Sequence, residues 1–160
     1  MATDTLSDVL RSVRLRGAVF YDLSFGREWA AEAPPAKEIA GAVIPGAEHV
    51  MEYHVITKGS GWAAIVGESP VRLETGDIVM FPQGDAHVIS SAPGIRPTRL
   101  SAEWAHATRN DPKPIPIVFH TPNEFSYGGP APESQSTVVC GFLGCGLRPF
   151  NPLIAALPRL

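Results

Sequence analysis

The sequence lacks the patterns that mark secreted, membrane-spanning and nucleic-acid-binding chains. Its 160 residues include only two cysteines, Cys140 and Cys145, which lie too close in sequence for a disulfide framework. No run approaches the roughly eighteen apolar residues of a membrane span, and the N-terminus has neither the basic nor the apolar region of a signal peptide. The formal net charge of −3 argues against a nucleic-acid face. We therefore expect one cytoplasmic domain that contacts neither membrane nor nucleic acid.

The familiar local signatures of catalysis are also missing. Neither cysteine has the flanking residues of a nucleophile site, no Ser-His-Asp arrangement can be assigned, and there is no CxxC metal spacing. The glycine pair of Gly59-Ser60-Gly61 leads into a tryptophan-containing strand rather than a helix, which excludes a phosphate-binding loop. Any catalytic or binding chemistry must come from residues that the fold brings together.

Turn-forming residues are abundant. The chain has 15 glycines and 16 prolines, and no long helical period outside its two ends. Turn signals at roughly ten-residue intervals between short β-rich runs are typical of an antiparallel sandwich or barrel. We therefore predict an all-β fold with a short helix at each end.

The most informative stretch runs from Gly76 to His87. It begins with a Gly-Asp turn, continues through four apolar residues typical of a buried strand, and breaks at Pro82 and Gly84. Proline fixes φ and glycine tolerates positive φ, so this pair predicts a sharp corner. His87 follows directly after that corner.

The remaining elements follow in order along a single domain, residues 1–160. We predict a helix over 5–16, barrel strands within 17–91 and 98–143, and a terminal helix over 151–157. The strand candidates include 17–25, 29–33, 98–104, 115–120 and 137–143. Residues 36–48 are expected to form a loop with at most one short strand, and residues 92–136 an ordered but irregular excursion.

Polar groups cluster on the predicted strand over 49–59. Side chains alternate across a strand, so Glu52 and His54 share one face. Together with His87 and with Cys140 on the last strand, they form a set that a barrel interior would bring together. Trp62 on the next strand is either part of the core or one wall of a ligand pocket.

Two interpretations of this set remain open. Imidazole, thiolate and carboxylate together suit zinc, and the set without the thiol would suit iron or manganese in an open site. Alternatively, His54 and His87 are hydrogen-bonded pocket histidines, Glu52 is ion-paired or exposed, and Cys140 is a small buried hydrophobe.

The stretch from Gly76 to His87 resembles the second signature of the cupin β-barrels, although Ser91 replaces the usual asparagine. The first signature is matched only by the spacing of Glu52 and Gly59, because its histidine pair is absent. Gly46 and Glu48, or Pro45 and Ala47, occupy those two positions. The resemblance implies a cupin-like jelly roll (a double-stranded β-helix), but not the usual centre of three histidines and one glutamate.

Nearly the whole chain is similar to the N-terminal, cupin-type sensor domain of AraC-family transcription regulators. The segments that carry the resemblance are Asp8-Val9-Leu10, Leu15 to Phe20, His54-Val55-Ile56 with Gly59 and Trp62, Val71 to His87, Val139-Cys140-Gly141, and Asn151 to Pro158. In such regulators this domain binds a small effector and dimerises, while a separate C-terminal pair of helix-turn-helix units binds DNA. No such units follow Leu160 here, so we expect either the sensor portion alone or a stand-alone relative.

The resemblance and the incomplete metal signature together favour an effector-binding domain over an enzyme. We expect the effector to contact Glu52, His54, Trp62 and His87, and the domain to form a homodimer. A divalent metal at His54, His87, Cys140 and Glu52, with zinc favoured, would have a structural or sensing role. The alternative is a small metal-dependent enzyme (a dioxygenase, isomerase or lyase) in which His54, His87 and Glu52 hold iron or manganese.

Overall fold

The computed structural model describes residues 15–121, 124–128, 133–146, 154 and 156–160. Within them the strands are β1 (Arg16–Phe25), β2 (Ala30–Ala33), β3 (His49–Lys58), β4 (Ser60–Ile65), β5 (Val71–Glu74), β6 (Ile78–Phe81), β7 (His87–Ser90), β8 (Thr98–Arg99), β9 (Ile115–Thr121), β10 (Glu124–Tyr127) and β11 (Ser136–Cys145). The helices are α2 (Ala36–Val43) and α3 (Ala102–Ala107). The prediction of an all-β fold is confirmed.

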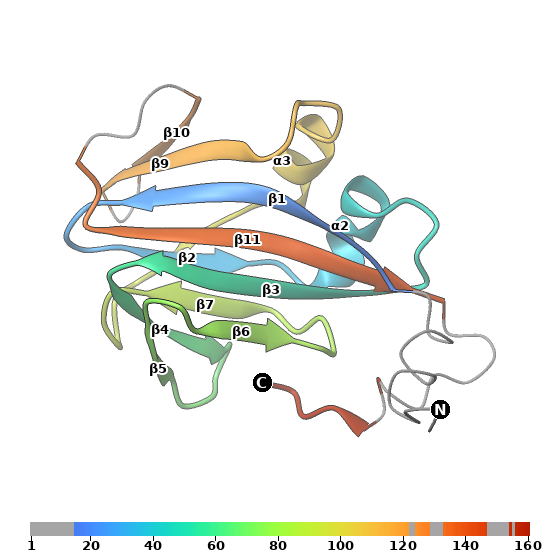
Figure 1. Ribbon diagram of the computed structural model, residues 1–160, viewed down its shortest axis with the longest axis horizontal. Helices are drawn as coiled ribbons and strands as arrows, with labels where there is room; N and C mark the ends of the chain where they lie inside the picture. Colours follow the sequence, from blue (N-terminus) through green and yellow to red (C-terminus); the bar gives the residue numbers. More distant parts are fainter. Residues whose placement is uncertain (1–14, 122–123, 129–132, 147–153, 155) are drawn as a thin grey trace, which may run out of the picture.

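The strands form two sheets, seen one behind the other in Figure 1. The six-stranded sheet has the order β10-β9-β1-β11-β3-β6, and the five-stranded sheet has the order β5-β4-β7-β2-β8. Most neighbours are antiparallel, as predicted, but β1 pairs with β9 and β2 pairs with β8 in parallel. Both parallel partners lie in the stretch 92–136, so this excursion contributes strands to both sheets instead of remaining irregular.

The core lies between the two sheets and follows the strand alternation. Its largest fully buried apolar side chains include Phe25, Trp29, Ile56, Phe81, Ile117, Val138 and Phe142. On β3 the even-numbered residues from Val50 to Ile56 point into this core and include both Glu52 and His54. The strand face predicted from the two-residue period is therefore confirmed, and it places polar groups inside an apolar core.

The corner after β6 also forms as predicted. Gly84 adopts φ +69°, a left-handed conformation that disfavours other residues. A side chain at this position would also meet the Ala36 Cβ and the Val50 carbonyl oxygen, both at 2.9 Å. The Gly84 carbonyl accepts a hydrogen bond from the Ala36 amide at 2.9 Å, which ties the corner to the start of α2.

Two helices form where strands or loops were expected. Residues 36–43 form α2, because Pro35 ends the preceding strand and Ala36, Ile39, Ala42 and Val43 make one buried helical face. The strand predicted at 98–104 is only β8, and α3 follows because the Ser101 side chain caps it by accepting from the Trp104 amide. No helix among the described residues is long and apolar enough to cross a membrane.

The two predicted terminal helices fall mostly outside the described residues. Residues 1–14 are not described, and Arg16, which was assigned to the first helix, instead begins β1. Of the predicted 151–157 helix, Ile154 and Ala156 are helical and the remaining described residue, Leu157, forms a bend. Ile154 is buried against Met51 and Cys145 on the outer side of the six-stranded sheet.

Candidate functional site

Three polar side chains meet inside the apolar core. Glu52 and His54 come from β3, and His87 begins β7 directly after the corner. Their exposed fractions are 5%, 3% and 1%. Burying such groups is costly unless they are hydrogen-bonded or hold a ligand, so their partners decide what the site can do.

The donor atoms of this Glu/His/His group face one another. The Nε2 atoms of His54 and His87 are 2.7 Å apart. One Glu52 carboxyl oxygen lies 3.8 Å from the His54 Nε2, and the other lies 3.9 Å from the His87 Nε2. One ligand atom from each residue fits within 4.8 Å of the others, so the group could hold a metal ion.

The hydrogen bonds determine which ring nitrogens carry protons. The Nδ1 atom of His87 is 2.8 Å from the backbone carbonyl oxygen of Asp85, which can only accept, so this nitrogen carries the hydrogen. In the neutral ring the Nε2 atom of His87 then accepts from the Nε2–H of His54. The Nδ1 atom of His54 in turn accepts from the Cys140 thiol, whose sulfur is 2.6 Å away.

This arrangement corrects the predicted role of Cys140. Its sulfur lies against Nδ1 of His54, on the opposite edge of the ring from the Nε2 atom that faces Glu52 and His87. An ion bound at Nε2 therefore has Cys140 behind the histidine rather than beside it. The pairing of β3 with β11 places Cys140 opposite His54, and the sequence indicates neither this register nor the ring edge that the sulfur meets.

Burial keeps all three members of the group uncharged near neutral pH. It raises the pKa of Glu52 to about 8. It lowers the pKa of His87 to about 4, with a smaller opposing effect from the Asp85 carbonyl. Burial and the neighbouring His87 lower the pKa of His54 well below its usual value. The contacts of Glu52 with the two histidines therefore join neutral groups.

One atom of the group has no partner. The Oε2 atom of Glu52 is buried and makes no hydrogen bond. An unsatisfied buried polar atom costs roughly 1–3 kcal/mol. A ligand or metal ion bound beside the two imidazoles could satisfy this atom.

The donor set fits a metal ion after a small adjustment. Two imidazoles and one carboxylate leave open positions on the ion, an arrangement found with zinc and with iron. Two nitrogens bound tetrahedrally to zinc lie about 3.3 Å apart, given Zn–N lengths of about 2.0–2.1 Å. The two Nε2 atoms at 2.7 Å would have to separate by several tenths of an ångström. The Nδ1–H of His87 is already held by a carbonyl, as histidine ligands commonly require.

A narrow apolar cavity of about 30 Å³ opens beside the group. Its lining includes Leu23, Ala33, Ile39, Leu100, Trp104, Ile117 and Phe142. This volume holds about two water molecules, so an organic ligand would require the walls to move. The Phe81 ring stacks on His87 at 3.6 Å between centroids and restricts the movement of that ring.

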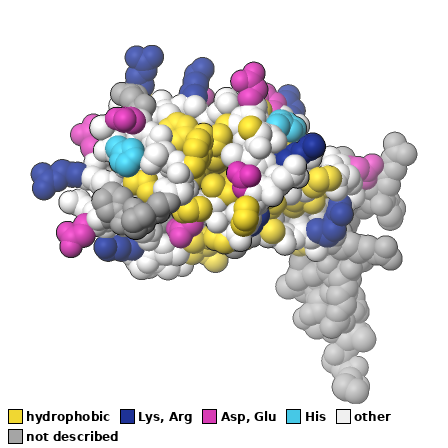
Figure 2. Space-filling model, turned by 90° about the horizontal axis from the view of Figure 1, so that it is seen from above, with side chains coloured by type: hydrophobic (Ala, Val, Ile, Leu, Met, Phe, Trp, Pro, Cys, Tyr) yellow, Lys and Arg dark blue, Asp and Glu magenta, His cyan; other side chains and the backbone are white. Residues whose placement is uncertain are grey.

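Helix α3 contributes a wall that the sequence reasoning missed. Trp104 from this helix stacks on Tyr127 at 5.3 Å between ring centroids and also contacts the ring of Tyr21. Figure 2 shows hydrophobic side chains gathered across the middle of the face seen from above. The helix could have been found from its local signal, because Ser101 followed by a glutamate in the first turn is typical of a helix start.

The other candidate residues lie elsewhere. Trp62 points to the outer side of β4, where Arg72 lies over its ring, because Gly61, Ala63 and Ile65 take the inward positions. It lines an outer groove rather than the cavity, so the structure does not bring it together with Glu52, His54 and His87. The three remaining histidines, His49, His106 and His120, contact Pro82, Glu38 and Ser126 respectively.

Among three comparisons with known proteins, the match to a protein-family model agrees with this architecture. A family model described as cupin matches residues 4–160. An (R)-mandelonitrile lyase of Granulicella tundricola is 29% identical over 102 residues, which cover 58% of this chain and 75% of that protein. The HTH-type transcriptional regulator MtrA of Neisseria gonorrhoeae is 55% identical over 38 residues, which cover 23% of this chain.

The match to MtrA takes in only 13% of that regulator's length. Among solved structures, an HTH_3 family transcriptional regulator from Vibrio cholerae aligns over 74% of this chain and 38% of that chain. The TM-score is 0.35 at 10% identity, a likeness too low to bear on the fold.

Proposed function

Because this chain belongs to the cupin family, we propose that it is the effector-binding sensor domain of an AraC-type transcriptional regulator. The short stretch shared with the regulator MtrA supports this proposal, as does the resemblance of the sequence to such sensor domains. The whole of residues 1–160 would form one sensor domain of a cytoplasmic protein.

The observation that carries the proposal is the buried Glu52 carboxyl with its unpartnered oxygen in an apolar cavity. While the site is empty, one buried polar atom has no hydrogen bond, which destabilises the folded protein. An occupant that contacts this atom removes that destabilisation. Such a site responds to occupancy, as a sensor must.

The occupant at the polar end would be one divalent metal ion held by Glu52, His54 and His87. Since Cys140 is not part of this set, the thiol no longer favours zinc, and zinc, iron and manganese all match the donors. The ion would supply an open coordination position for a polar group of the effector. The surrounding residues would hold the apolar remainder of the effector.

The effector would therefore be small and mostly apolar, with one polar end. A cavity of about 30 Å³ does not admit such a molecule while α3 is closed over it. Effector binding would then favour an arrangement in which α3 has moved. A ligand can shift an equilibrium only through its different affinity for the two states, and this movement supplies that difference. Homodimerisation would carry the change to DNA-binding units.

A lyase-type cupin enzyme is the second candidate. The relative with the longer match is an (R)-mandelonitrile lyase, and the aligned part covers 75% of that protein. A Glu/His/His group with open metal positions would also serve such chemistry. The two candidates differ in turnover, because an enzyme would consume a substrate at the site whereas a sensor would only bind it.

The test uses the complete gene product that contains this chain. Binding to its own promoter DNA would be measured by fluorescence anisotropy, with zinc and with a chelator, for the unaltered protein and for Glu52→Gln. We expect the metal to change the DNA affinity at least about tenfold, and the variant to abolish that change. A product that binds no DNA but cleaves mandelonitrile in its metal-loaded form would instead establish the enzyme.

A further inference from the structure

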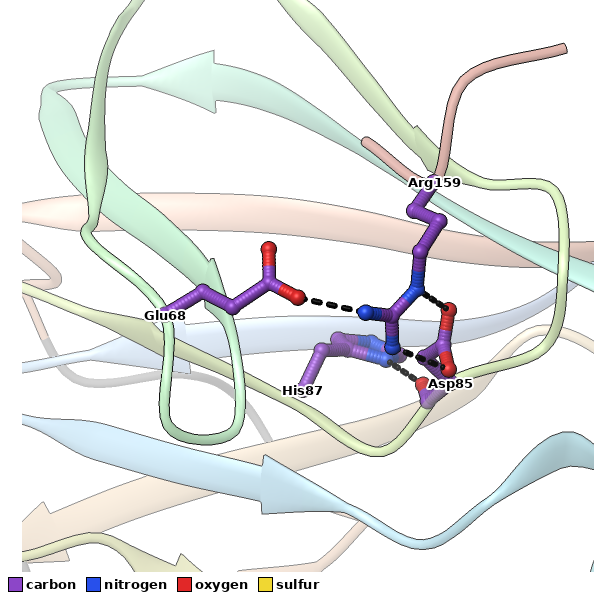
Figure 3. Close-up of polar contacts among 4 residues, drawn as sticks. All are labelled: Glu68, Asp85, His87 and Arg159. Atoms are coloured by element: carbon purple, nitrogen blue, oxygen red, sulfur yellow. Dashed lines mark hydrogen bonds and ion pairs between the residues drawn. The ribbon is translucent and has the colours of Figure 1, made fainter.

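The loop that delivers His87 also holds the C-terminal residues. We call residues 82–86, between β6 and β7, the corner loop. Figure 3 shows Arg159 between Glu68 on one side and Asp85 of the corner loop on the other, with His87 next to Asp85. The corner loop therefore has one contact directed into the protein and another directed outward.

The outward contact is an ion pair in which the Arg159 guanidinium makes two hydrogen bonds to the Asp85 carboxylate. The Nε–H of Arg159 donates to one Asp85 carboxylate oxygen at 3.1 Å, and an Nη2–H donates to the other at 2.7 Å. An Nη1–H of the same guanidinium donates to Glu68 at 2.6 Å. Two parallel hydrogen bonds from one guanidinium hold the orientation of a carboxylate, which a single point charge does not. Arg159 thus fastens the corner loop to the turn after β4.

The inward contact comes from the same residue. The backbone carbonyl oxygen of Asp85 accepts the Nδ1–H of His87 at 2.8 Å. This hydrogen bond holds the His87 ring so that its Nε2 lone pair points toward His54 and Glu52. A change in the orientation of Asp85 therefore moves the carbonyl oxygen that holds the His87 ring.

A second anchor joins the C-terminal residues to the same loop. The side-chain amide of Gln83 donates to the backbone carbonyl of Ile154 at 2.9 Å. Ile154 is buried against Met51, which lies on the opposite face of β3 from Glu52 and His54. Residues 154 and 159 therefore hydrogen-bond to the corner loop at Gln83 and Asp85, on either side of Gly84.

We propose that occupancy of the Glu52/His54/His87 group is coupled to the docking of the C-terminal residues 154 and 156–160 on the corner loop. The inference rests on the proposed function for the identity of the occupant. A metal ion needs the His87 lone pair in place, and Arg159 stabilises the loop that places it. Linkage requires the reverse effect as well, so occupancy strengthens the docking. The docking of the C-terminal residues therefore depends on whether the Glu52/His54/His87 group is occupied.

The test compares Arg159→Gln with Arg72→Gln in the full chain. Arg72 is a matched control, because it is an exposed arginine paired with Glu74 at 2.7 Å and does not contact the corner loop. Zinc affinity would be measured by calorimetry on metal-stripped protein. The ion pairs of Arg159 are exposed, so we expect only about three- to fivefold weaker zinc binding in Arg159→Gln and a change within about twofold in Arg72→Gln.

A second measurement does not depend on metal. In nitrogen-15 spectra of the imidazole rings, the Nδ1–H of His87 should exchange with water faster in Arg159→Gln than in the unaltered protein or in Arg72→Gln. If both variants match the unaltered protein in zinc affinity and in His87 exchange, the coupling is refuted. If zinc does not bind the unaltered protein, the proposed metal role fails, and the His87 exchange rates alone decide the coupling.

Discussion

His54 and His87 approach each other through their Nε2 atoms, which lie 2.7 Å apart in the interior of the protein. One ring must donate and the other accept, and the Asp85 carbonyl determines that His54 is the donor. A metal ion bound between the rings needs a lone pair on both nitrogens. His54 must then carry its hydrogen on Nδ1, so its partner there, Cys140, must change from donor to acceptor.

Substitution of Cys140 tests this rearrangement. In the metal-bound protein the Nδ1–H of His54 would donate to residue 140, and loss of such a supporting partner typically costs about 10- to 100-fold in metal affinity. We expect Cys140→Ala to weaken zinc binding by about this factor and Cys140→Ser, which keeps an acceptor, to weaken it less. Cys145→Ala is the control, since Cys145 is also buried but packs with Met51 and Ile154. Equal affinities for the alanine and serine variants would argue against the rearrangement.

The stability of the metal-free protein should fall as the pH rises from 6.5 to 8. Burial raises the pKa of Glu52 from 4.5 to about 8, so its contribution to folding is complete below pH 4.5 and is lost as the pH rises to 8. The pKa values of His87 and His54 are lowered by burial from 6.5, that of His87 to about 4, so these two residues add a little stability as the pH rises past 6.5 and change it only slightly across this window. Glu52 alone then lowers the free energy of unfolding by up to about 1.4 kcal/mol per pH unit.

Denaturant titrations with a chelator present would measure this slope. In Glu52→Gln the group no longer titrates, so the free energy of unfolding should be nearly constant between pH 6.5 and 8. A variant with the same slope as the unaltered protein would show that another group is responsible.

The corner before His87 should tolerate no side chain at Gly84. Gly84→Ala places a Cβ 2.9 Å from the Ala36 Cβ and the Val50 carbonyl oxygen, in addition to the strain of φ +69°. Gly67→Ala has only the strain, because φ is +88° there and nothing lies within 4 Å of the added Cβ. We expect losses of about 3 kcal/mol and about 1 kcal/mol respectively in the free energy of unfolding. Equal losses would mean that the corner is not closely packed.

Helix α3 should control access to the cavity. Trp104→Ala removes the stacking on Tyr127 and the tilted ring contact with Tyr21 and opens a cavity wall, so it should destabilise the fold by about 2 kcal/mol. Small apolar probes such as benzene should then stabilise this variant more than the unaltered protein in thermal melts. Trp62→Ala on the outer side of β4 is the control and should show no such gain. A gain of the same size in both variants would mean that α3 does not cover the cavity.

The parts of the fold that were predictable from sequence depend on local rules. Pro82 and Gly84 restrict the backbone wherever they occur, so the corner before His87 was evident. The two-residue period of β3 placed Glu52 and His54 on one inward face for the same reason. The same rule applied to β4 would have placed Trp62 outward, opposite Ala63 and Ile65.

The parts that were not predictable depend on contacts between distant segments. Helix α2 was missed because the small residues and the proline and glycine of 36–48 suggested a loop, although residues 36–43 form one buried helical face. The position of Cys140 behind His54 depends on the register between β3 and β11 and on a ring orientation, and neither is written in the sequence. The role of Asp85 depends on Arg159, which lies 74 residues later.

The most direct test of the account is a zinc titration of metal-stripped protein by calorimetry, comparing the unaltered chain with Glu52→Ala, His54→Ala, His87→Ala and Trp62→Ala. The account predicts one ion per chain, lost in the first three variants and retained in Trp62→Ala with its affinity changed by no more than about twofold, since one ligand of three contributes several kcal/mol to binding. Circular dichroism would show that each variant is folded. No binding by the unaltered chain, or binding that survives in all three site variants, would contradict the account.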